Sequence, residues 1–159
     1  MKINASEKWP FFCAYHDKKH IKSHDQKKIV VLREPREARE YRLENKSVKE
    51  LVVYQIDGGV ISSNDVLKCD YGVFTEDNVL FFVELKGADY IHALDQMNST
   101  INLLIEKPQI KIGQLNARIV LSKVNVPAIL PTQEKKLLLK VKKFKGTFMK
   151  QSRKLEEAI

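Results

Sequence analysis

Hydrophobic and polar positions along the chain predict a series of short strands and one long helix. Three runs in the middle are rich in β-branched and aromatic residues and bounded by turn residues; they cover 51–56, 68–75 and 79–86. Residues 76–78 separate the last two runs and suit a hairpin loop, because Asn78 tolerates a left-handed backbone. Another run, 29–33, predicts a strand nearer the N-terminus. The aromatic cluster of residues 9–15 predicts a helix or loop packed on the core.

A helix is expected directly after the strand 79–86. Apolar residues recur at helical spacing from Ile91 to Ile105, and Asp89 precedes them as a natural N-cap. The expected end is near Glu106, before Pro108. Residues 115–124 predict a further strand, residues 132–145 suit either a strand or a helix, and residues 147–149 suit a short strand.

The stretch 35–50 completes the expected core. It opens with a proline and is densely charged, which predicts an exposed helix. The resulting order is helix, three strands, helix, strand. This order is typical of an α/β fold with one central mixed sheet flanked by helices.

Length and composition indicate one domain. The chain has 159 residues, of which 43% are hydrophobic, and no stretch resembles a linker, so we expect one domain over 1–159. The longest apolar run, 79–83, is far shorter than the roughly 20 residues that cross a bilayer. The N-terminus lacks an apolar signal core, and the two cysteines, Cys13 and Cys69, do not form a disulfide framework. We therefore expect a cytoplasmic protein without a membrane partner.

Charged residues stand at the end of the most apolar strand. Glu84 and Lys86 are two positions apart, so their side chains project from the same face. With 76–78 as the loop, Asp70 lies opposite Glu84, with Cβ atoms about 4.5–5.5 Å apart. Two such carboxylates repel unless a cation lies between them, and hard oxygen ligands favour Mg²⁺ or Mn²⁺. The alternative is a structural salt bridge of Lys86 with either carboxylate.

Residues 68–74, residues 79–87 and the following helix resemble the PD-(D/E)XK nuclease superfamily. The resemblance covers roughly residues 35–125, and Cys69 stands where the motif has its proline. It implies a restriction-endonuclease-like, Holliday-junction-resolvase-like α-β-β-β-α-β core. It also implies a metal-dependent nuclease that hydrolyses DNA phosphodiester bonds, as an endonuclease, with Mg²⁺ as cofactor and Mn²⁺ able to substitute.

The resemblance implies roles for individual residues. Asp70 and Glu84 would be metal ligands, with the backbone carbonyl of Leu85 as a third. Lys86 would be the catalytic lysine, and Gln96 a supporting residue of the catalytic site. Such small domains often form homodimers, so that two sites can cut two strands.

Many members of the superfamily take an extra ligand from a glutamate on the first helix. Four glutamates of the stretch 35–50 are candidates, namely Glu37, Glu40, Glu44 and Glu50, and Glu44 is the preferred one. Asp57 is also near the sheet, but the glycines that follow it indicate a turn residue.

Positive charge is concentrated near the C-terminus. The net charge is +8, and residues 133–154 carry nine Lys or Arg and one Glu, whereas the rest of the chain is balanced. Such a segment suggests a polyanion as partner, here DNA, contacted through phosphates. The lysines concerned are Lys135, Lys136, Lys140, Lys142, Lys143 and Lys145. The alternative is a solvated face without a partner.

Three histidines and a cysteine, Cys13, His16, His20 and His24, lie within twelve residues. On a helix the histidines would share one face, but ligands on a single helix cannot surround a tetrahedral ion. We expect a surface helix here and no zinc site.

Two alternatives to an active nuclease stay open. One is a catalytically inactive nucleic-acid-binding module with the same fold. The other is a nuclease subunit that needs a protein partner for specificity.

Overall fold

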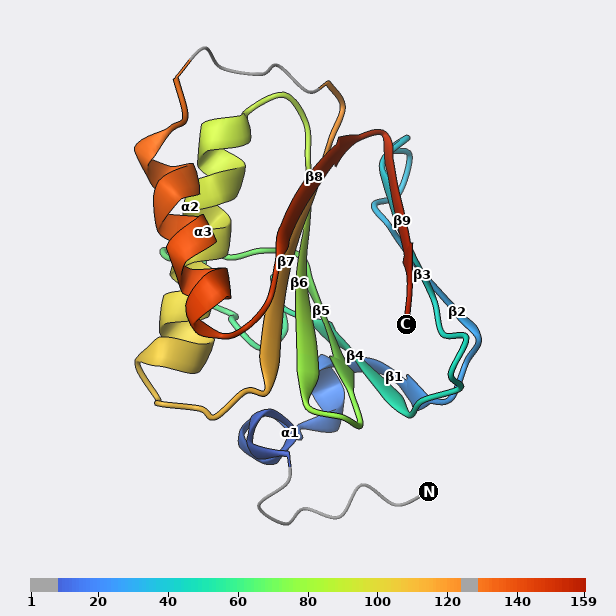
Figure 1. Ribbon diagram of the computed structural model, residues 1–159. Coiled ribbons are helices and arrows are strands. Elements are labelled where there is room, and N and C mark those ends of the chain that lie inside the picture. Colours follow the sequence, from blue (N-terminus) through green and yellow to red (C-terminus); the bar gives the residue numbers. More distant parts are fainter. Residues whose placement is uncertain (1–8, 124–128) are drawn as a thin grey trace.

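A computed structural model describes residues 9–123 and 129–159 (Figure 1). The α-helices are α1 (Pro10–Ala14), α2 (Tyr90–Ile101) and α3 (Thr132–Lys143), with a 3₁₀ turn at Lys18–His20 and a π-helical turn at Asn102–Glu106. The strands are β1 (Ile21–Asp25), β2 (Ile29–Arg33), β3 (Glu40–Glu44), β4 (Leu51–Gln55), β5 (Tyr71–Thr75), β6 (Val79–Lys86), β7 (Gln114–Leu121), β8 (Phe148–Ser152) and β9 (Lys154–Ala158).

Six strands form a central mixed sheet in the order β1-β4-β5-β6-β7-β8. The neighbours from β1 to β6 are antiparallel, whereas β6, β7 and β8 run parallel. The β5–β6 hairpin has the expected register, since Tyr71 pairs with Val83 and Phe74 with Leu80. Asn78 has the left-handed backbone that the loop requires, with φ of 60°.

The central sheet lies between a helical layer and a second sheet (Figure 1). Helices α1, α2 and α3 contribute to the core on one face. On the other face lies a three-stranded sheet in the order β2-β3-β9. The expected mixed α/β class is confirmed, but helices cover only one face of the central sheet in the part of the chain that is described.

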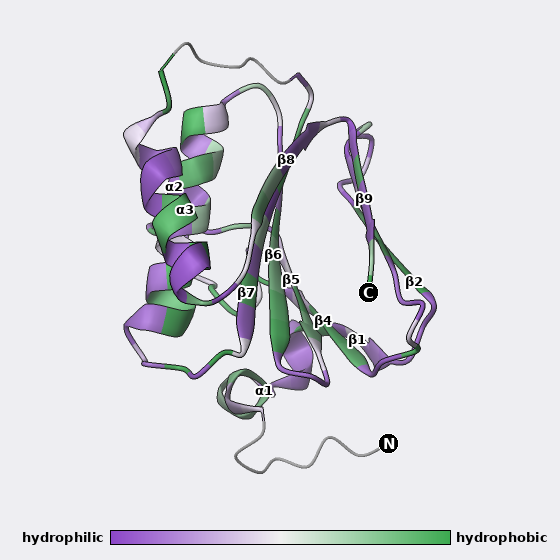
Figure 2. Ribbon diagram, in the orientation of Figure 1, coloured by the Kyte–Doolittle hydropathy of each residue, from purple (hydrophilic) through white to green (hydrophobic). Residues whose placement is uncertain are grey.

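Strand β6 is buried on both faces and is hydrophobic along most of its length (Figure 2). Leu80 and Phe82 belong to the core under the helices, and Phe81 and Val83 belong to the core between the sheets. Because side chains alternate along a strand, Glu84 and Lys86 belong to the helical face.

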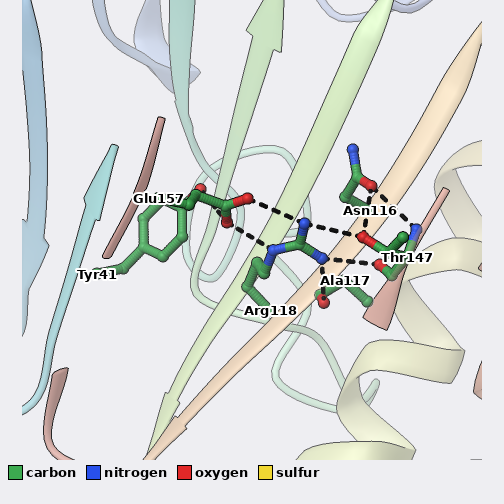
Figure 3. A network of polar contacts seen from close by, with 6 residues as sticks. All are labelled: Tyr41, Asn116, Ala117, Arg118, Thr147 and Glu157. Atoms are coloured by element: carbon green, nitrogen blue, oxygen red, sulfur yellow. Dashed lines mark hydrogen bonds and ion pairs between the residues drawn. The ribbon is translucent and has the colours of Figure 1, made fainter. Parts of the chain in front are cut away.

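A buried ion pair joins the two sheets (Figure 3). Arg118 of β7 donates from Nε to Glu157 Oε2 at 2.6 Å and from Nη2 to Glu157 Oε1 at 3.0 Å. Its other hydrogen bonds go to the carbonyl oxygens of Ala117 and Thr147 and to the Thr147 hydroxyl. Tyr41 of β3 donates its hydroxyl to Glu157 at 3.0 Å. The guanidinium therefore anchors β9, and with it the second sheet, to the centre of the first.

The helix expected over 35–50 is wrong. This stretch forms turns and strand β3, in which Tyr41 and Leu43 are buried and the intervening Arg42 is half-buried. Glu40, Arg42 and Glu44 share one face of the strand, and Arg36, Glu37 and Arg39 lie in the connection before it. Its neighbours in the sheet are β2 and the C-terminal β9, and pairing with a strand so far away in the sequence leaves no local signal.

Other expectations are mostly confirmed. Strands form at 29–33, 51–55 and 79–86, and the strand expected over 68–75 begins only at Tyr71. Asp89 caps α2 by accepting from the His92 backbone N–H. The open alternative at 132–145 resolves as a helix. The strand expected over 115–124 ends at Leu121 in the structure, and Val124, the last residue of the expected range, lies outside the described residues.

Glu157→Ala leaves the buried Arg118 without its ion-pair partner, whereas Arg118→Ala leaves the half-buried Glu157. We expect Glu157→Ala to lower the free energy of unfolding by about 3–5 kcal/mol in urea titrations, and Arg118→Ala to lower it as well. The double variant Arg118→Met/Glu157→Leu should lose clearly less than the sum of the two.

The Arg42–Glu156 pair, 3.3 Å apart on the adjacent β3 and β9, is the matched control because it is more exposed. Arg42→Ala should cost less than about 1 kcal/mol. Strictly additive losses at Arg118 and Glu157 would contradict the anchoring role.

Candidate active site

The site expected from the sequence lies where the end of β6 meets the start of β5. Asp70 Oδ2 accepts the backbone N–H of Leu85 at 2.8 Å. In return, the Glu84 carboxylate accepts a hydrogen bond from the backbone N–H of Asp70. These two hydrogen bonds hold the carboxylates side by side across the hairpin.

Glu84 is buried at high cost. Glu84 is 2% exposed, and its Oε2 has no hydrogen-bond partner in the part of the chain that is described. Burial, followed by the nearby charge of Asp70, raises its pKa well above the usual value, and the charge of Lys86 opposes this shift. Among the described residues Glu50 and Glu134 also have a buried oxygen without a partner, but Glu50 is bonded to His24 and Glu134 to Lys150 through the other oxygen. Glu84 has no such ion pair in the described chain, and this calls for a functional explanation.

Asp70 is perturbed in the same direction. Burial raises its pKa to about 6, the Leu85 N–H opposes the shift, and the charges of Glu34 and Asp57 add to it. Two neighbouring carboxylates with raised pKa values are typical of functional sites, where like charges are held close together in the absence of the ligand that would neutralise them.

Lys86 is the third member of the expected trio. It is half-buried at the last position of β6, two residues from Glu84. Its charge lowers the pKa of both Asp70 and Glu84. No ion pair within 4 Å joins it to either carboxylate in the described chain, so the simple salt bridge is not formed.

Helix α2 positions the segment that carries Asp70. Gln96 donates from Nε2 to the carbonyl oxygen of Lys68 at 3.0 Å. One turn later, the Thr100 hydroxyl oxygen accepts the backbone N–H of Cys69 at 2.8 Å. Gln96 thus acts on the site through the backbone next to Asp70. The Oε1 atom of Gln96 is buried and lacks a hydrogen-bond partner among residues 9–123 and 129–159.

Two further carboxylates stand near the pair, and the sequence did not single them out as site residues. Glu34, in the connection between β2 and β3, accepts a hydrogen bond from the Tyr71 hydroxyl at 2.8 Å. Asp57 is a turn residue, as expected, and lies 3.7 Å from the buried Lys68. The sequence indicated that Asp57 lies near the sheet. It gave no such sign for Glu34, which follows β2 and reaches the site because β2 belongs to the second sheet.

The donors at this site fit a hard divalent cation. Asp70, Glu84 and the Leu85 carbonyl would supply oxygen ligands, and Glu84 Oε2 has no hydrogen-bond partner among the described residues. In the described residues no group of three or more His, Cys, Asp and Glu side chains is placed to hold a metal ion. Two carboxylates and main-chain oxygen would hold such a cation, and for Mg²⁺ the other coordination positions would go to water or phosphate.

Glu44 is not brought to the site. It lies at the end of β3 that pairs with Ile29, and its carboxylate is 3.8 Å from Lys46. The other three candidates have partners elsewhere: Glu37 pairs with Arg39, Glu40 with Arg33 and Lys154, and Glu50 with His24. The expected first-helix ligand fails because the first helix does not form.

The C-terminal lysines lie on α3 and the turn after it. Lys135, Lys136, Lys142, Lys143 and Lys145 are exposed. Lys140 is not, because its Nζ lies 3.0 Å from Glu106 Oε2 and contacts the carbonyl oxygen of Asn98. Leu139, between these lysines, is 70% exposed.

The histidine cluster does not lie on one helix. Cys13 belongs to α1, His20 to the 3₁₀ turn and His24 to β1, so the surface helix expected here is wrong. The spacing of the histidines at i, i+4 and i+8 suggested one face of a helix. Instead, residue 21 and residues 23–25 pair with β4 as a strand. His24 Nε2 lies 2.6 Å from Glu50 Oε1.

Comparison with known proteins gives no family assignment: no family model matches the chain, and no curated protein or solved structure matches it. In the part of the chain that is described, no helix is long and apolar enough to cross a membrane. Function must therefore be argued from the site.

The raised pKa of Asp70 predicts a pH dependence of stability. In the unfolded chain this carboxyl ionises near pH 3.8, but in the folded chain only near 6. Between these values the folded state binds more protons, so stability falls as the pH rises, by about 3 kcal/mol for Asp70 alone. Asp70→Asn should remove this part of the loss.

The measurement is urea unfolding of both chains at pH 4.5 and pH 7. Asp70→Asn should be more stable than the wild type at pH 7 and have the flatter profile. Asp65→Asn, a change in the exposed loop before β5, serves as control. Parallel profiles of the wild type and Asp70→Asn would show that the carboxyl ionises normally.

Proposed function

We propose that this protein is a metal-dependent nuclease that hydrolyses phosphodiester bonds in DNA, with an endonuclease of PD-(D/E)XK type as the specific class. The observation that carries the proposal is the buried Glu84 carboxylate, whose Oε2 has no partner while a second perturbed carboxylate, Asp70, lies beside it. Folding alone has no use for this arrangement, because burying unpaired charge is costly.

The topology around the pair supports the same class. Strands β4, β5 and β6, helix α2 and strand β7 follow in the order that the resemblance implies, with β6 and β7 parallel. The first helix of the expected core is replaced by β3 and its turns. We therefore propose a restriction-endonuclease-like core only for the part of the chain from β4 to β7.

Each residue has a distinct task in the proposed reaction. Asp70, Glu84 and the Leu85 carbonyl would hold Mg²⁺ or Mn²⁺. When bound, the cation would supply charge to stabilise the phosphate and acidity to activate water. Lys86, on the same face as Glu84, would orient the attacking water and stabilise negative charge as it develops on the phosphate. Gln96 would act as a positioning residue, through the Lys68 carbonyl.

A second function has one observation in its favour. The two carboxylates lack a third acidic ligand in the described residues, which suits a DNA-binding module without activity or a subunit completed by a protein partner. A homodimer is the simplest assembly in which an active form could cut two strands. The cleavage test below separates these cases.

Cleavage should require the metal and the trio. Purified protein with single-stranded, duplex and branched DNA, and with RNA, should cut at least one DNA in Mg²⁺ or Mn²⁺ and nothing in EDTA. Asp70→Ala, Glu84→Ala and Lys86→Ala should each lower the cleavage rate about 100-fold or more.

Lys107→Ala is the matched lysine control, because Lys107 is exposed after the π-helical turn that follows α2. It should cleave like the wild type. Wild-type activity in Asp70→Ala would refute the proposed site, and salt-sensitive DNA binding without cleavage would favour the inactive module.

Metal binding has its own readout, independent of cleavage. At a Mg²⁺ or Mn²⁺ concentration ten times its dissociation constant, the folded state should gain about 1.4 kcal/mol, seen as a higher Tm. Glu84→Gln keeps the shape but loses the charge, so the gain should disappear. An equal Tm shift in Glu84→Gln would place the cation elsewhere.

A further inference from the structure

A groove lies between the edges of the two sheets. Its wider part has a volume of about 410 Å³ and is lined by Lys22, Val31, Leu32, Arg33 and Tyr71. A narrower part of about 170 Å³ shares Lys22, Val31 and Leu32 with it and reaches Lys27 and Ile29. One wall is β1, the edge strand of the central sheet, and the other is β2, the edge strand of the second sheet.

The groove carries positive charge that is only partly compensated. Lys22 Nζ lies 5.4 Å from the centre of the Tyr71 ring and 3.4 Å from Gln55 Oε1, and it has no carboxylate within 4 Å in the described chain. Arg33 pairs with Glu40, but Glu40 has a second cation in Lys154 at 3.8 Å. Glu34, which accepts from the Tyr71 hydroxyl, adds a second carboxylate, so an anion between Lys22 and Arg33 would meet three cations and two carboxylates.

Apolar side chains accompany these cations. Burial alternates along β2, so that Ile29, Val31 and Arg33 share its exposed face. Ile29 is 43% exposed and Val31 39% exposed, which leaves apolar surface beside the cations. A ligand for this groove needs both negative charge and apolar parts.

The groove approaches the candidate active site at the start of β5, although Tyr71 faces the second sheet whereas Glu84 and Lys86 face the helices. Tyr71, which lines its wider part, directly follows Asp70, and its hydroxyl donates to Glu34. The charge of Glu34 in turn acts on Asp70. A strand bound at Asp70 would therefore pass the start of β5 at Glu34 to reach the other face of the sheet and lie between Lys22 and Arg33.

We infer that this groove binds the single-stranded nucleic-acid segment next to the phosphodiester that is cut. One phosphate lies between Lys22 and Arg33, and the adjoining sugar and base contact Val31 and Ile29. A duplex presents mainly phosphates at its surface and keeps its bases stacked inside, so it would leave these apolar side chains without partners. Single strands combine backbone charge with accessible bases. The position of the cut phosphodiester in this inference rests on the proposed nuclease function. The bound strand would follow the groove and not α3.

The test measures binding of a short fluorescein-labelled oligothymidylate by anisotropy, in EDTA and over a range of salt concentrations. Lys22→Gln and Arg33→Gln should each weaken binding about fivefold at 0.1 M salt and reduce the salt slope by about 0.7, as expected for one lost phosphate contact to a single strand. Lys136→Gln on α3 removes the same charge and should leave binding unchanged. Thermal unfolding of each variant checks that the fold is intact.

The outcomes separate the two proposals. If Lys136→Gln weakens binding and Lys22→Gln does not, the strand follows α3 and the groove inference is overturned. Metal-dependent cleavage with normal binding in both groove variants would also overturn it while the nuclease stands. Binding that depends on Lys22, with no cleavage of any substrate, would keep the groove and refute the nuclease.

Discussion

Strand β6 has no exposed face along most of its length, and the architecture follows from that constraint. Helices bury Leu80 and Phe82 from one side, and the second sheet buries Phe81 and Val83 from the other. The second sheet stays in place because Arg118 reaches from β7 to Glu157 of β9. A charged side chain at the end of β6 therefore enters a low-dielectric environment, and this raises the pKa of Glu84. The burial of β6 on both faces thus underlies both the hydrophobic core and the raised pKa of Glu84 at the candidate site.

Much of the fold could be predicted because its signals are local. The apolar run of β6, the turn before it and the helical periodicity after it gave β5, β6 and α2 in the correct order and register. The second sheet gave no such signal. Its middle strand β3 is charged on one face and pairs with β9, more than a hundred residues away. The spacing of His16, His20 and His24 suggested a helix, but the structure has strand β1 in this region, paired with β4. Three equally spaced residues do not by themselves distinguish a helix from other structure, and the strand that pairs with them is not visible in the local sequence.

The candidate site divides along the same line. Asp70, Glu84 and Lys86 followed from one hairpin register, and Gln96 from a resemblance that marked the helix after it. Glu34 could not be found, because its approach depends on a connection within the second sheet. Glu44 was chosen on the assumption of a helix, and the strand that replaced this helix puts Glu44 at the wrong end. Local sequence therefore identifies the centre of the site, and non-local packing decides what surrounds it.

Charge in the sequence and charge at the site point to different surfaces. The C-terminal lysines dominate the net charge, yet Lys140 is held by Glu106, and the others are spread along a helix and the turn after it. Arg33 is inconspicuous in the sequence, because Glu34, Glu37 and Glu40 balance the charge of its segment, whereas Lys22 belongs to a stretch, 17–28, with five lysines and two aspartates. The fold keeps Glu40 against Arg33 and sets both cations beside apolar surface, in a groove that Tyr71, the residue after Asp70, also lines. Screening limits the reach of exposed charges to about 10 Å, so an exposed cation acts on a ligand at the buried carboxylates only if it lies within that distance, whatever the net charge of its segment.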